Sequence, residues 1–397
     1  MAHLLAQSIA VLTTLLAIAG IGYFLAAIFA AQRFLALRRS PSPPFAPGVT
    51  ILKSLKGLDP GMIEAFRGHC RQEYDGDYEL LFGVSTADDP AAAVVRHLQD
   101  EFPDTKIRLV VCPQRLGTNG KVSTLIQLLP HVHHDFLLIN DSDISVSSHY
   151  LSRVMACFAS PSAQRKDAQK EVGLVTTLYR GKANETLASR FEALGIATDF
   201  QSGVLLDKLI AGGLSYGLGA TLAVRREALQ KIGGLEVLVD LLADDYELGS
   251  RVAKAGYRVE LSTEVVETEV PAYTWRGFVE HQLRWARTVR DASPGGYVGL
   301  LFTHGFVLAL LNAFTSGFSP LSLWLLGMSF FLRLALAMTV GGQVLGDHQV
   351  LPGLLLLPLR DLVAAGVWVA GFAGNAIVWR GERFLLKDGK LLSQERR

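Results

Sequence analysis

The chain has 397 residues, and its 38 Lys and Arg nearly balance its 37 Asp and Glu, giving a formal charge of +1. Half of the residues are hydrophobic and 19% are charged, and the mean hydropathy of +0.29 is high for a soluble enzyme. This composition excludes a disordered chain, a collagen and a coiled coil. The near-neutral charge also argues against a dedicated nucleic-acid-binding protein, which would carry a basic excess.

The first apolar run, from Leu4 to Ala31, contains no charged residue. It is long enough to cross a hydrocarbon core of about 30 Å. The basic residues Arg33, Arg38 and Arg39 follow the run, which is typical of a signal anchor rather than of a cleaved signal peptide. The positive-inside rule then places the N-terminus outside and the following chain in the cytosol. We expect residues 1–31 to form a transmembrane anchor and residues 32–47 to form a Pro-rich linker.

A second apolar region covers residues 294–380 and contains three candidate spans, Tyr297–Phe318, Leu321–Val340 and Leu351–Trp379. Four complete crossings would put the basic tail, residues 381–397, outside, whereas the positive-inside rule favours the cytosol. One segment could therefore be re-entrant or lie in the interface. The third is the best candidate, because two prolines and an Arg-Asp pair interrupt it. Three and four spans both stay open.

Residues 48–275 have the pattern of one soluble α/β domain. Brief apolar runs bounded by turn residues predict four buried parallel strands, at Val49–Leu52, Glu79–Val84, Ile107–Val111 and Phe136–Asn140. Stretches of helical composition lie between them, at Gly61–Glu73, Pro90–Asp100 and Gly120–Leu129. This alternation predicts a layered α/β fold with right-handed crossovers. Ligands of such sheets bind at the carboxyl ends of the strands.

Acidic residues follow two of these strands. Asp88 and Asp89 come after the second strand, and Asp141 and Asp143 come directly after the fourth. Side chains two positions apart on an extended segment point to the same side, so the second pair can converge on one point. Mg²⁺ or Mn²⁺ would join two such carboxylates and also take substrate phosphates. The alternative is a solvated turn with no ligand.

A third acidic cluster, Asp244-Asp245-Tyr246-Glu247, follows a Gly-rich segment. Asp244 or Asp245 could simply cap a helix over Tyr246–Ala255, but a carboxylate there could also act as a base. Residues 276–293 then read as an amphipathic helix that could lie in the membrane interface. This helix contains His281-Gln282-Leu283-Arg284-Trp285.

Taken together, these motifs resemble the ceramide glucosyltransferase family, the family 21 glycosyltransferases with a GT-A fold, including bacterial members associated with hopanoids. The resemblance runs from about Pro47 to Arg290. It is carried by Asp88-Asp89-Pro90-Ala91, Asp141-Ser142-Asp143, Ala243-Asp244-Asp245-Tyr246 and Arg284-Trp285. The family has three aspartate motifs and a final (Gln/Arg)-x-x-Arg-Trp motif, which here begins with His281.

The resemblance implies a role for each matching residue. Asp89 would lie beside the uracil and ribose of the donor, and Lys121 and Asp141 would lie near its diphosphate. Asp141 and Asp143 would hold Mn²⁺ or Mg²⁺, and Asp245 would be the general base. Arg284 and Trp285 would lie near the diphosphate and the acceptor.

The implied reaction moves a hexose with inversion from a UDP-sugar to a lipid hydroxyl, in first place from UDP-glucose to ceramide. A hopanoid glycosyltransferase using UDP-N-acetylglucosamine is the alternative acceptor and donor pair. Two further readings are a processive polysaccharide synthase and a non-catalytic lipid-binding or transport protein. We expect a multi-pass protein of a bacterial inner membrane, with the catalytic domain in the cytosol and no nucleic-acid partner.

Overall fold

The computed structural model describes residues 1–39, 44–159, 170–379 and 382–393. The chain divides into two compact units. We call residues 40–179, 210–269 and 387–397 the sheet unit, and residues 1–39, 180–209 and 270–386 the helical unit. Parts of the predicted linker (residues 40–43) and of the basic tail (residues 380–381 and 394–397) lie outside the described residues.

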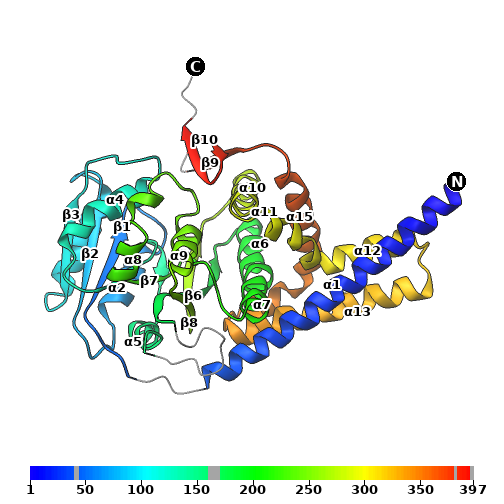
Figure 1. Ribbon diagram of the computed structural model, residues 1–397, viewed down its shortest axis with the longest axis horizontal. Helices are drawn as coiled ribbons and strands as arrows, with labels where there is room; N and C mark the ends of the chain where they lie inside the picture. Colours follow the sequence, from blue (N-terminus) through cyan, green and yellow to red (C-terminus); the bar gives the residue numbers. More distant parts are fainter. Residues whose placement is uncertain (40–43, 160–169, 380–381, 394–397) are drawn as a thin grey trace. The chain divides into compact units, whose positions relative to one another are not determined.

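The sheet unit is built on an eight-stranded sheet with the order β3-β2-β1-β4-β7-β6-β8-β5 (Figure 1). Its first half is parallel and contains the four predicted strands, β1 (Val49–Ser54), β2 (Tyr78–Val84), β3 (Lys106–Val111) and β4 (Phe136–Ile139). The predicted mixed α/β class is confirmed. Strand β3 is less buried than predicted, because it lies at the edge of the sheet.

The helices between these strands also follow the prediction, at α2 (Met62–Cys70), α3 (Pro90–Glu101) and α4 (Gly120–Leu128). Each presents apolar residues to the sheet, such as Phe66 of α2 and Val95 of α3, both fully buried in one core with Ile51 and Phe82. Helix α4 begins at Gly120, and the side chain of the preceding Asn119 caps it by accepting a hydrogen bond from the Val122 amide.

The other half of the sheet contains antiparallel pairs, and the sequence pattern did not predict it. Strand β7 (Leu222–Arg225) pairs with β4 and with β6 (Val172–Ala183), and β8 (Arg258–Val270) pairs with β5 (Ile144–Ser145). Helices α5 (Tyr150–Ala156), α8 (Arg226–Lys231) and α9 (Asp244–Lys254) belong to the same unit.

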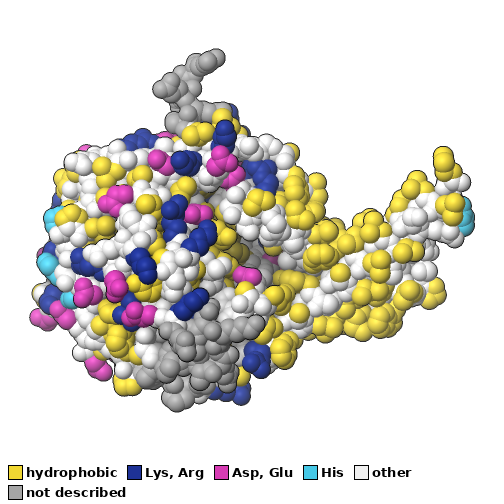
Figure 2. Space-filling model, in the orientation of Figure 1, with side chains coloured by type: hydrophobic (Ala, Val, Ile, Leu, Met, Phe, Trp, Pro, Cys, Tyr) yellow, Lys and Arg dark blue, Asp and Glu magenta, His cyan; other side chains and the backbone are white. Residues whose placement is uncertain are grey.

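In the helical unit, three long helices pack side by side: α1 (Ala2–Arg38), α12 (Gly305–Thr315) and α13 (Pro320–Ala337), which continues to Val344 as a π-helix (Figure 1). Gly20 of α1 meets Gly305 so closely that a Cβ on Gly20 would lie 2.4 Å from the Gly305 Cα. The outer surface of these helices is largely apolar, and Figure 2 shows many yellow side chains along it with white atoms between them.

The remaining helices of this unit are shorter. A helical stretch of residues 187–211 comprises α6 (Leu187–Gly195), a π-helical turn (Ile196–Phe200) and α7 (Gln201–Ala211). Downstream come α10 (Trp275–Ala292), α11 (Pro294–Gly299), α14 (Val350–Gly353) and α15 (Leu357–Gly371). Helix α10 matches the predicted amphipathic helix, and Thr274 caps it.

Within the described residues, four helical segments are long and apolar enough to cross a membrane: His3–Arg38, Pro294–Thr315, Pro320–Val344 and Val350–Gly371. They coincide with the four predicted apolar regions. The last differs at its end, because the helix stops at Gly371 and residues predicted to continue it form strand β9 (Ala376–Trp379). The tail adds β10 (Glu382–Lys387) and β11 (Lys390–Ser393), which complete a three-stranded sheet.

Candidate active site

The carboxyl ends of the parallel strands carry the predicted acidic residues, and Asp89 follows β2. Its carboxylate caps α3 by accepting a hydrogen bond from the Ala91 amide at 2.9 Å. It also accepts from the Gly57 amide at 3.0 Å, so it ties the loop after β1 to the start of α3. Gly57 has a φ of +69°, a conformation that favours glycine. The predicted contact of Asp89 with the donor stays a prediction.

Lys121 links two of the acidic motifs. Its Nζ lies 2.7 Å from Oδ1 of Asp141 and 3.4 Å from Oδ2 of Asp244. Burial by itself would lower the pKa of Lys121, but the carboxylates of Asp141 and Asp244 raise it above its ordinary value. Asn119 supports the arrangement by donating to Asp244 Oδ1 at 3.3 Å and to the Leu241 carbonyl at 2.8 Å.

Asp141 and Asp143 follow β4 in a turn. Burial, followed by the charge of Asp141, raises the pKa of Asp143 to about 6. Thr268 of β8 donates to Asp143 Oδ2 at 2.5 Å. Beneath them, Lys53 of β1 is 1% exposed and donates to the Asp141 carbonyl at 2.9 Å. Burial lowers the pKa of Lys53 to about 7, against the opposing effect of Asp143 and Asp141.

Asp245 approaches the same place from α9. A Cβ added to Gly219 would lie 3.0 Å from Asp245 Oδ2 and 3.7 Å from Asp141 Oδ2. Both carboxylates therefore come close to one point, and the glycine leaves that space open. Burial, followed by the charge of Asp244, raises the pKa of Asp245 to about 6, while Lys121 opposes this rise.

The alternative that Asp244 or Asp245 caps the helix is wrong. Helix α9 begins at Asp244, its N-cap is Ala243, and no side chain caps it. Both aspartates instead lie in the first turn, where the helix dipole favours negative charge. Asp245 Oδ1 accepts a hydrogen bond from the Tyr246 amide at 2.8 Å, which leaves Oδ2 directed toward Gly219.

The final motif lies in the helical unit, on α10. The Trp285 ring packs against Phe200 and His281, with centroids 5.9 and 5.2 Å apart. His281 lies 3.2 Å from Oε1 of the buried Glu192, whose Oε2 accepts a hydrogen bond from Gln282 at 2.7 Å. Arg284 lies one position before Trp285, and its carbonyl accepts a hydrogen bond from Thr288. The predicted roles of Arg284 and Trp285 stay predictions.

A divalent cation fits the Asp141 and Asp143 pair by the chemistry of its donors. Among the described residues, no three or more His, Cys, Asp or Glu side chains are grouped to hold a metal ion. Mg²⁺ and Mn²⁺, however, commonly use one or two carboxylates and complete their shell with waters and substrate phosphates. Burial is the larger cause of the raised pKa of Asp143, and the charge of Asp141 adds a repulsion that a cation would relieve.

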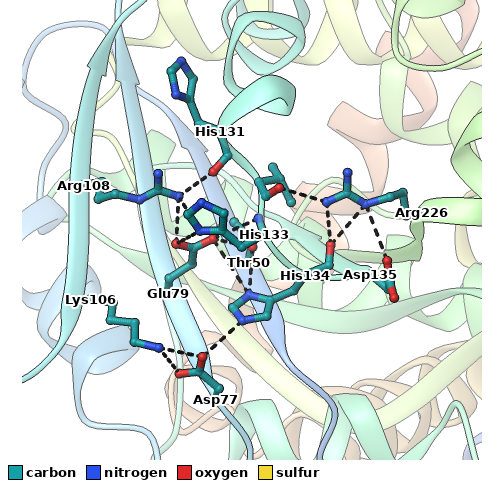
Figure 3. A network of polar contacts seen from close by, with 11 residues as sticks. Thr50, Asp77, Glu79, Lys106, Arg108, His131, His133, His134, Asp135 and Arg226 are labelled. Atoms are coloured by element: carbon teal, nitrogen blue, oxygen red, sulfur yellow. Dashed lines mark hydrogen bonds and ion pairs between the residues drawn. The ribbon is translucent and has the colours of Figure 1, made fainter.

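The opposite, amino edge of the parallel strands carries a separate polar network (Figure 3). Glu79 of β2 is 2% exposed and accepts hydrogen bonds from Thr50 at 2.7 Å and Arg108 at 2.8 Å. His133 and His134 also face Glu79, at 3.3 and 3.8 Å. Because ligands of such sheets bind at the carboxyl edge, we interpret this network as structural.

Sequence reasoning missed three residues of the site: Lys53, Asn119 and Gly219. A lysine in the otherwise apolar run of β1 was a signal, because a buried lysine needs a polar partner. Asn119 directly precedes a predicted helix, which indicates a cap, but its contact with Asp244 depends on tertiary structure. Gly219 is one of four glycines between residues 212 and 219, and nothing in the sequence of this Gly-rich segment singles it out.

Comparison with known proteins agrees with this architecture. A ceramide glucosyltransferase of Caenorhabditis elegans is 23% identical over 356 residues, which cover 86% of this chain and 73% of that protein. A beta-monoglucosyldiacylglycerol synthase of Synechocystis is 23% identical over 252 residues, covering 63% and 48%. Among solved structures, a mannosyltransferase of Pyrobaculum calidifontis in complex with GDP-Man and Mn²⁺ superimposes with a TM-score of 0.55 at 21% identity, covering 92% of this chain and 97% of that one.

The structural likeness shows a shared GT-A fold. The sequence profile of glycosyl transferase family 21 matches residues 12–392, which is nearly the whole chain. The chain therefore belongs to glycosyl transferase family 21, and it is a glycosyltransferase with four helices long and apolar enough to cross a membrane in its described part.

Proposed function

We propose that this enzyme transfers a hexose with inversion from a UDP-sugar to a lipid hydroxyl, and that the pair is UDP-glucose and ceramide. The observation that carries the proposal is the approach of Asp141 and Asp245 to one point beside Gly219, with Lys121 joining Asp141 to Asp244. The relatives named ceramide glucosyltransferase support the choice of sugar and acceptor.

Asp245 is the proposed general base. The acceptor oxygen attacks the anomeric carbon, the bond from that carbon to the phosphate oxygen breaks, and the acceptor proton passes to Asp245. A pKa of about 6 suits this task, because the carboxylate is ionised at neutral pH yet still a stronger base than an ordinary aspartate. Its free Oδ2, directed toward Gly219, is the atom that receives the proton.

The departing UDP gains negative charge, which needs nearby positive charge. Lys121 supplies a fixed ammonium at the carboxyl edge of the sheet, and Arg284 of the final motif would add a guanidinium. Asp141 and Asp143 would hold Mn²⁺ or Mg²⁺, which when bound supplies further positive charge to the diphosphate. Asp89 and Trp285 are assigned to the donor and to the acceptor end of the site by their match to the family motifs.

A membrane-embedded acceptor suits the four apolar helices. We place the N-terminus outside and the sheet unit in the cytosol, because Arg33, Arg38 and Arg39 follow α1. A bacterial inner membrane is the proposed location. UDP-sugars would then reach the site directly from the cytosol, and the lipid would reach it from the adjoining leaflet.

The test is a transfer assay with the full chain in detergent, using UDP-glucose or UDP-N-acetylglucosamine with ceramide, diacylglycerol or a hopanoid alcohol. Mass spectrometry should find one hexose added to ceramide from UDP-glucose. Diacylglycerol is included because a relative is named for that lipid. A different preferred pair would replace the proposed substrates, and a polymeric product would replace the reaction class.

The metal is tested in the same assay. Treatment with EDTA should stop transfer, and added Mn²⁺ or Mg²⁺ should restore it. Full activity in EDTA would remove the metal from the proposal and leave Lys121 and Arg284 as the only charges assigned to the leaving group.

A further inference from the structure

The last described residues of the chain belong to the sheet unit. The Leu391 amide donates to the Asp240 carbonyl at 2.9 Å, and the Leu242 amide donates to the Gly389 carbonyl at 3.1 Å. Leu241 and Lys390 form an antiparallel bridge, and the Leu391 side chain is 1% exposed. Residues 387–393 therefore lie on the same side of the membrane as the acidic site.

This contact restricts the number of crossings. The chain leaves the sheet unit after Glu269 and returns to it at Lys387. A segment that starts and ends on one side of a membrane crosses it an even number of times. Three candidate spans lie between these two points, so at least one of them does not cross. Helix α10 does not change the count, because it carries charged residues along its length.

The first two of these spans pack beside α1 along its length. Near the start of α1, Thr14 donates to Asn312 of α12 at 2.9 Å. At its end, Arg38 donates to the Val344 carbonyl, where the α13 helix finishes, also at 2.9 Å. The hairpin of α12 and α13 therefore runs out and back beside the anchor (Figure 1). If α1 crosses the membrane, this hairpin crosses it twice.

The third candidate, Val350–Gly371, has different neighbours. Leu356 and Val363 pack on Phe191 of α6 and Phe278 of α10. Arg360 of α15 donates to the Phe191 carbonyl at 3.0 Å. At the far end, Arg290 of α10 donates to the carbonyl of Gly371, the last residue of α15, and to the carbonyl of Gly374 just beyond it. Helix α15 thus rests along a helix rich in arginine, which cannot lie in hydrocarbon without great cost.

The other face of this segment is apolar and exposed. The exposed side chains follow one another at intervals of three, four or seven residues, which places them on one face of a helix, and they are Leu351 (64%), Leu355 (92%), Leu359 (53%), Leu362 (43%), Val369 (62%) and Phe372 (47%). Arg360 and Asp361 are each 5% exposed and turn inward. One face therefore needs an apolar partner while the other is already covered.

We propose that residues 350–372 do not cross the membrane but lie along its surface, with this stripe of leucines, valine and phenylalanine in the leaflet on the same side of the membrane as the acidic site. The partner of the stripe is the lipid bilayer, because it continues the apolar surface of α1, α12 and α13 within the same unit (Figure 2). Only three of the four candidate helices then cross. The segment anchors the enzyme where an amphipathic helix would.

The first test places single cysteines in the full chain in sealed vesicles, in a Cys157→Ser background, because the other two cysteines are buried. Asp104→Cys marks the sheet unit, Leu392→Cys marks the tail and His3→Cys marks the N-terminus. A membrane-impermeant maleimide should label the first two from one side and His3→Cys from the other. Labelling of Leu392→Cys only from the side opposite to Asp104→Cys would overturn the proposal.

The second test measures depth with spin labels at Leu351, Leu359 and Val369. A crossing helix would spread these labels over about 27 Å of depth, because a helix rises about 1.5 Å per residue. A helix along the surface should hold all three at one shallow depth. The control is α13, where labels at the exposed Leu321, Trp324 and Phe331 should show a steady gradient. A gradient in both segments would overturn the assignment of α15, even if the tail and the sheet unit share a side.

Discussion

The Nζ atom of Lys121 lies 2.7 Å from Oδ1 of Asp141. This ion pair joins α4, the helix after β3, to the turn after β4. Both segments lie at the carboxyl edge of the parallel strands. Lys121 also reaches Asp244, so a single ammonium balances two of the acidic motifs. The charge of Lys121 therefore balances the resting site, and in the proposed mechanism it also balances the departing diphosphate.

Replacing Lys121 with Met should lower kcat/KM by about 10²–10³-fold, the range for loss of one group that stabilises developing charge. Lys121→Arg should keep part of the activity, because it keeps the charge but not the geometry. Steady-state kinetics in detergent measures both. Lys254→Met, an exposed lysine in the last turn of α9, is the matched control and should behave as the wild type. Equal losses in Lys121→Arg and Lys121→Met would show that charge is not what Lys121 contributes.

The pH dependence of the reaction should reflect the raised carboxylate pKa values. Asp245 and Asp143 have pKa values of about 6, and the proposed base acts only when ionised. The rate constant kcat/KM should therefore fall as the pH drops through about 6, and the midpoint belongs to the coupled cluster rather than to one residue. In Lys121→Met the midpoint should move to higher pH, because Lys121 lowers the pKa of Asp245. A midpoint near 4 in the wild type would contradict the assignment of Asp245 as the base.

The parallel half of the fold was predictable because its strands are short apolar runs between turn residues, and β1 illustrates this with five buried residues in a row. The antiparallel half was not predicted, although β8 alternates buried and partly exposed residues over much of its length. Such alternation indicates a strand, but not its neighbours. The order β7-β6-β8-β5 depends on contacts between distant segments, which a local pattern does not contain.

The part of the site that directly follows a predicted strand could be predicted from the sequence. Asp141 follows a buried strand, so its place at the carboxyl edge could be inferred from sequence alone. The approach of Asp245 to the same point could be inferred only through the family resemblance, because 104 positions of chain numbering separate the two residues. Their closeness depends on how β4 and β7 pair and on the small size of Gly219, and neither follows from local sequence.

Gly219 should not tolerate a side chain. A Cβ there would lie 3.0 Å from Asp245 Oδ2, closer than ordinary van der Waals contact, so Gly219→Ala should displace the proposed base. The φ of Gly219 is not positive, and the backbone itself should accept alanine. We expect kcat to fall by about 10-fold or more, since small misplacements of a catalytic group are costly, with little change in Tm. Gly327→Ala, where a Cβ would meet nothing within 4 Å, should leave both unchanged. Wild-type kcat in Gly219→Ala would show that the space beside Asp245 is not used.

The network at the amino edge should affect stability and not catalysis. Hydrogen bonds from Thr50 and Arg108 hold the pKa of Glu79 below its ordinary value despite burial, which acts in the opposite direction. The stabilisation is present at neutral pH and is lost as the pH falls through the lowered pKa. Glu79→Gln should reduce the free energy of unfolding by about 1–3 kcal/mol, seen as a lower Tm at pH 7, with KM unchanged. Glu73→Gln, an exposed glutamate, should change neither, and a large change of KM in Glu79→Gln would contradict the structural interpretation.

The ionised carboxylate of Asp245 should have the opposite effect on stability to that of Glu79. Its folded-state pKa of about 6 exceeds the ordinary value of 3.8, so the folded protein binds the proton more tightly than the unfolded chain does. The ionised carboxylate therefore destabilises the fold above about pH 6, and this penalty disappears below about pH 4. Because the pKa of Asp245 rises from 3.8 to about 6, Asp245→Asn should raise the free energy of unfolding at pH 8 by about 1–3 kcal/mol, and the gain should shrink toward pH 4.

The same substitution should lower transfer by about 10²–10⁴-fold, as expected for loss of a general base, while UDP-sugar binding is kept. Thermal unfolding and product assays on one preparation measure both effects. Glu247→Gln, in the same turn of α9 and paired with Arg251, should alter neither property strongly. If Asp245→Asn is more stable but less active than the wild type, the Asp245 charge is kept for catalysis at a cost in stability. Loss of both stability and activity in Asp245→Asn would instead identify Asp245 as a structural residue and remove it from the mechanism.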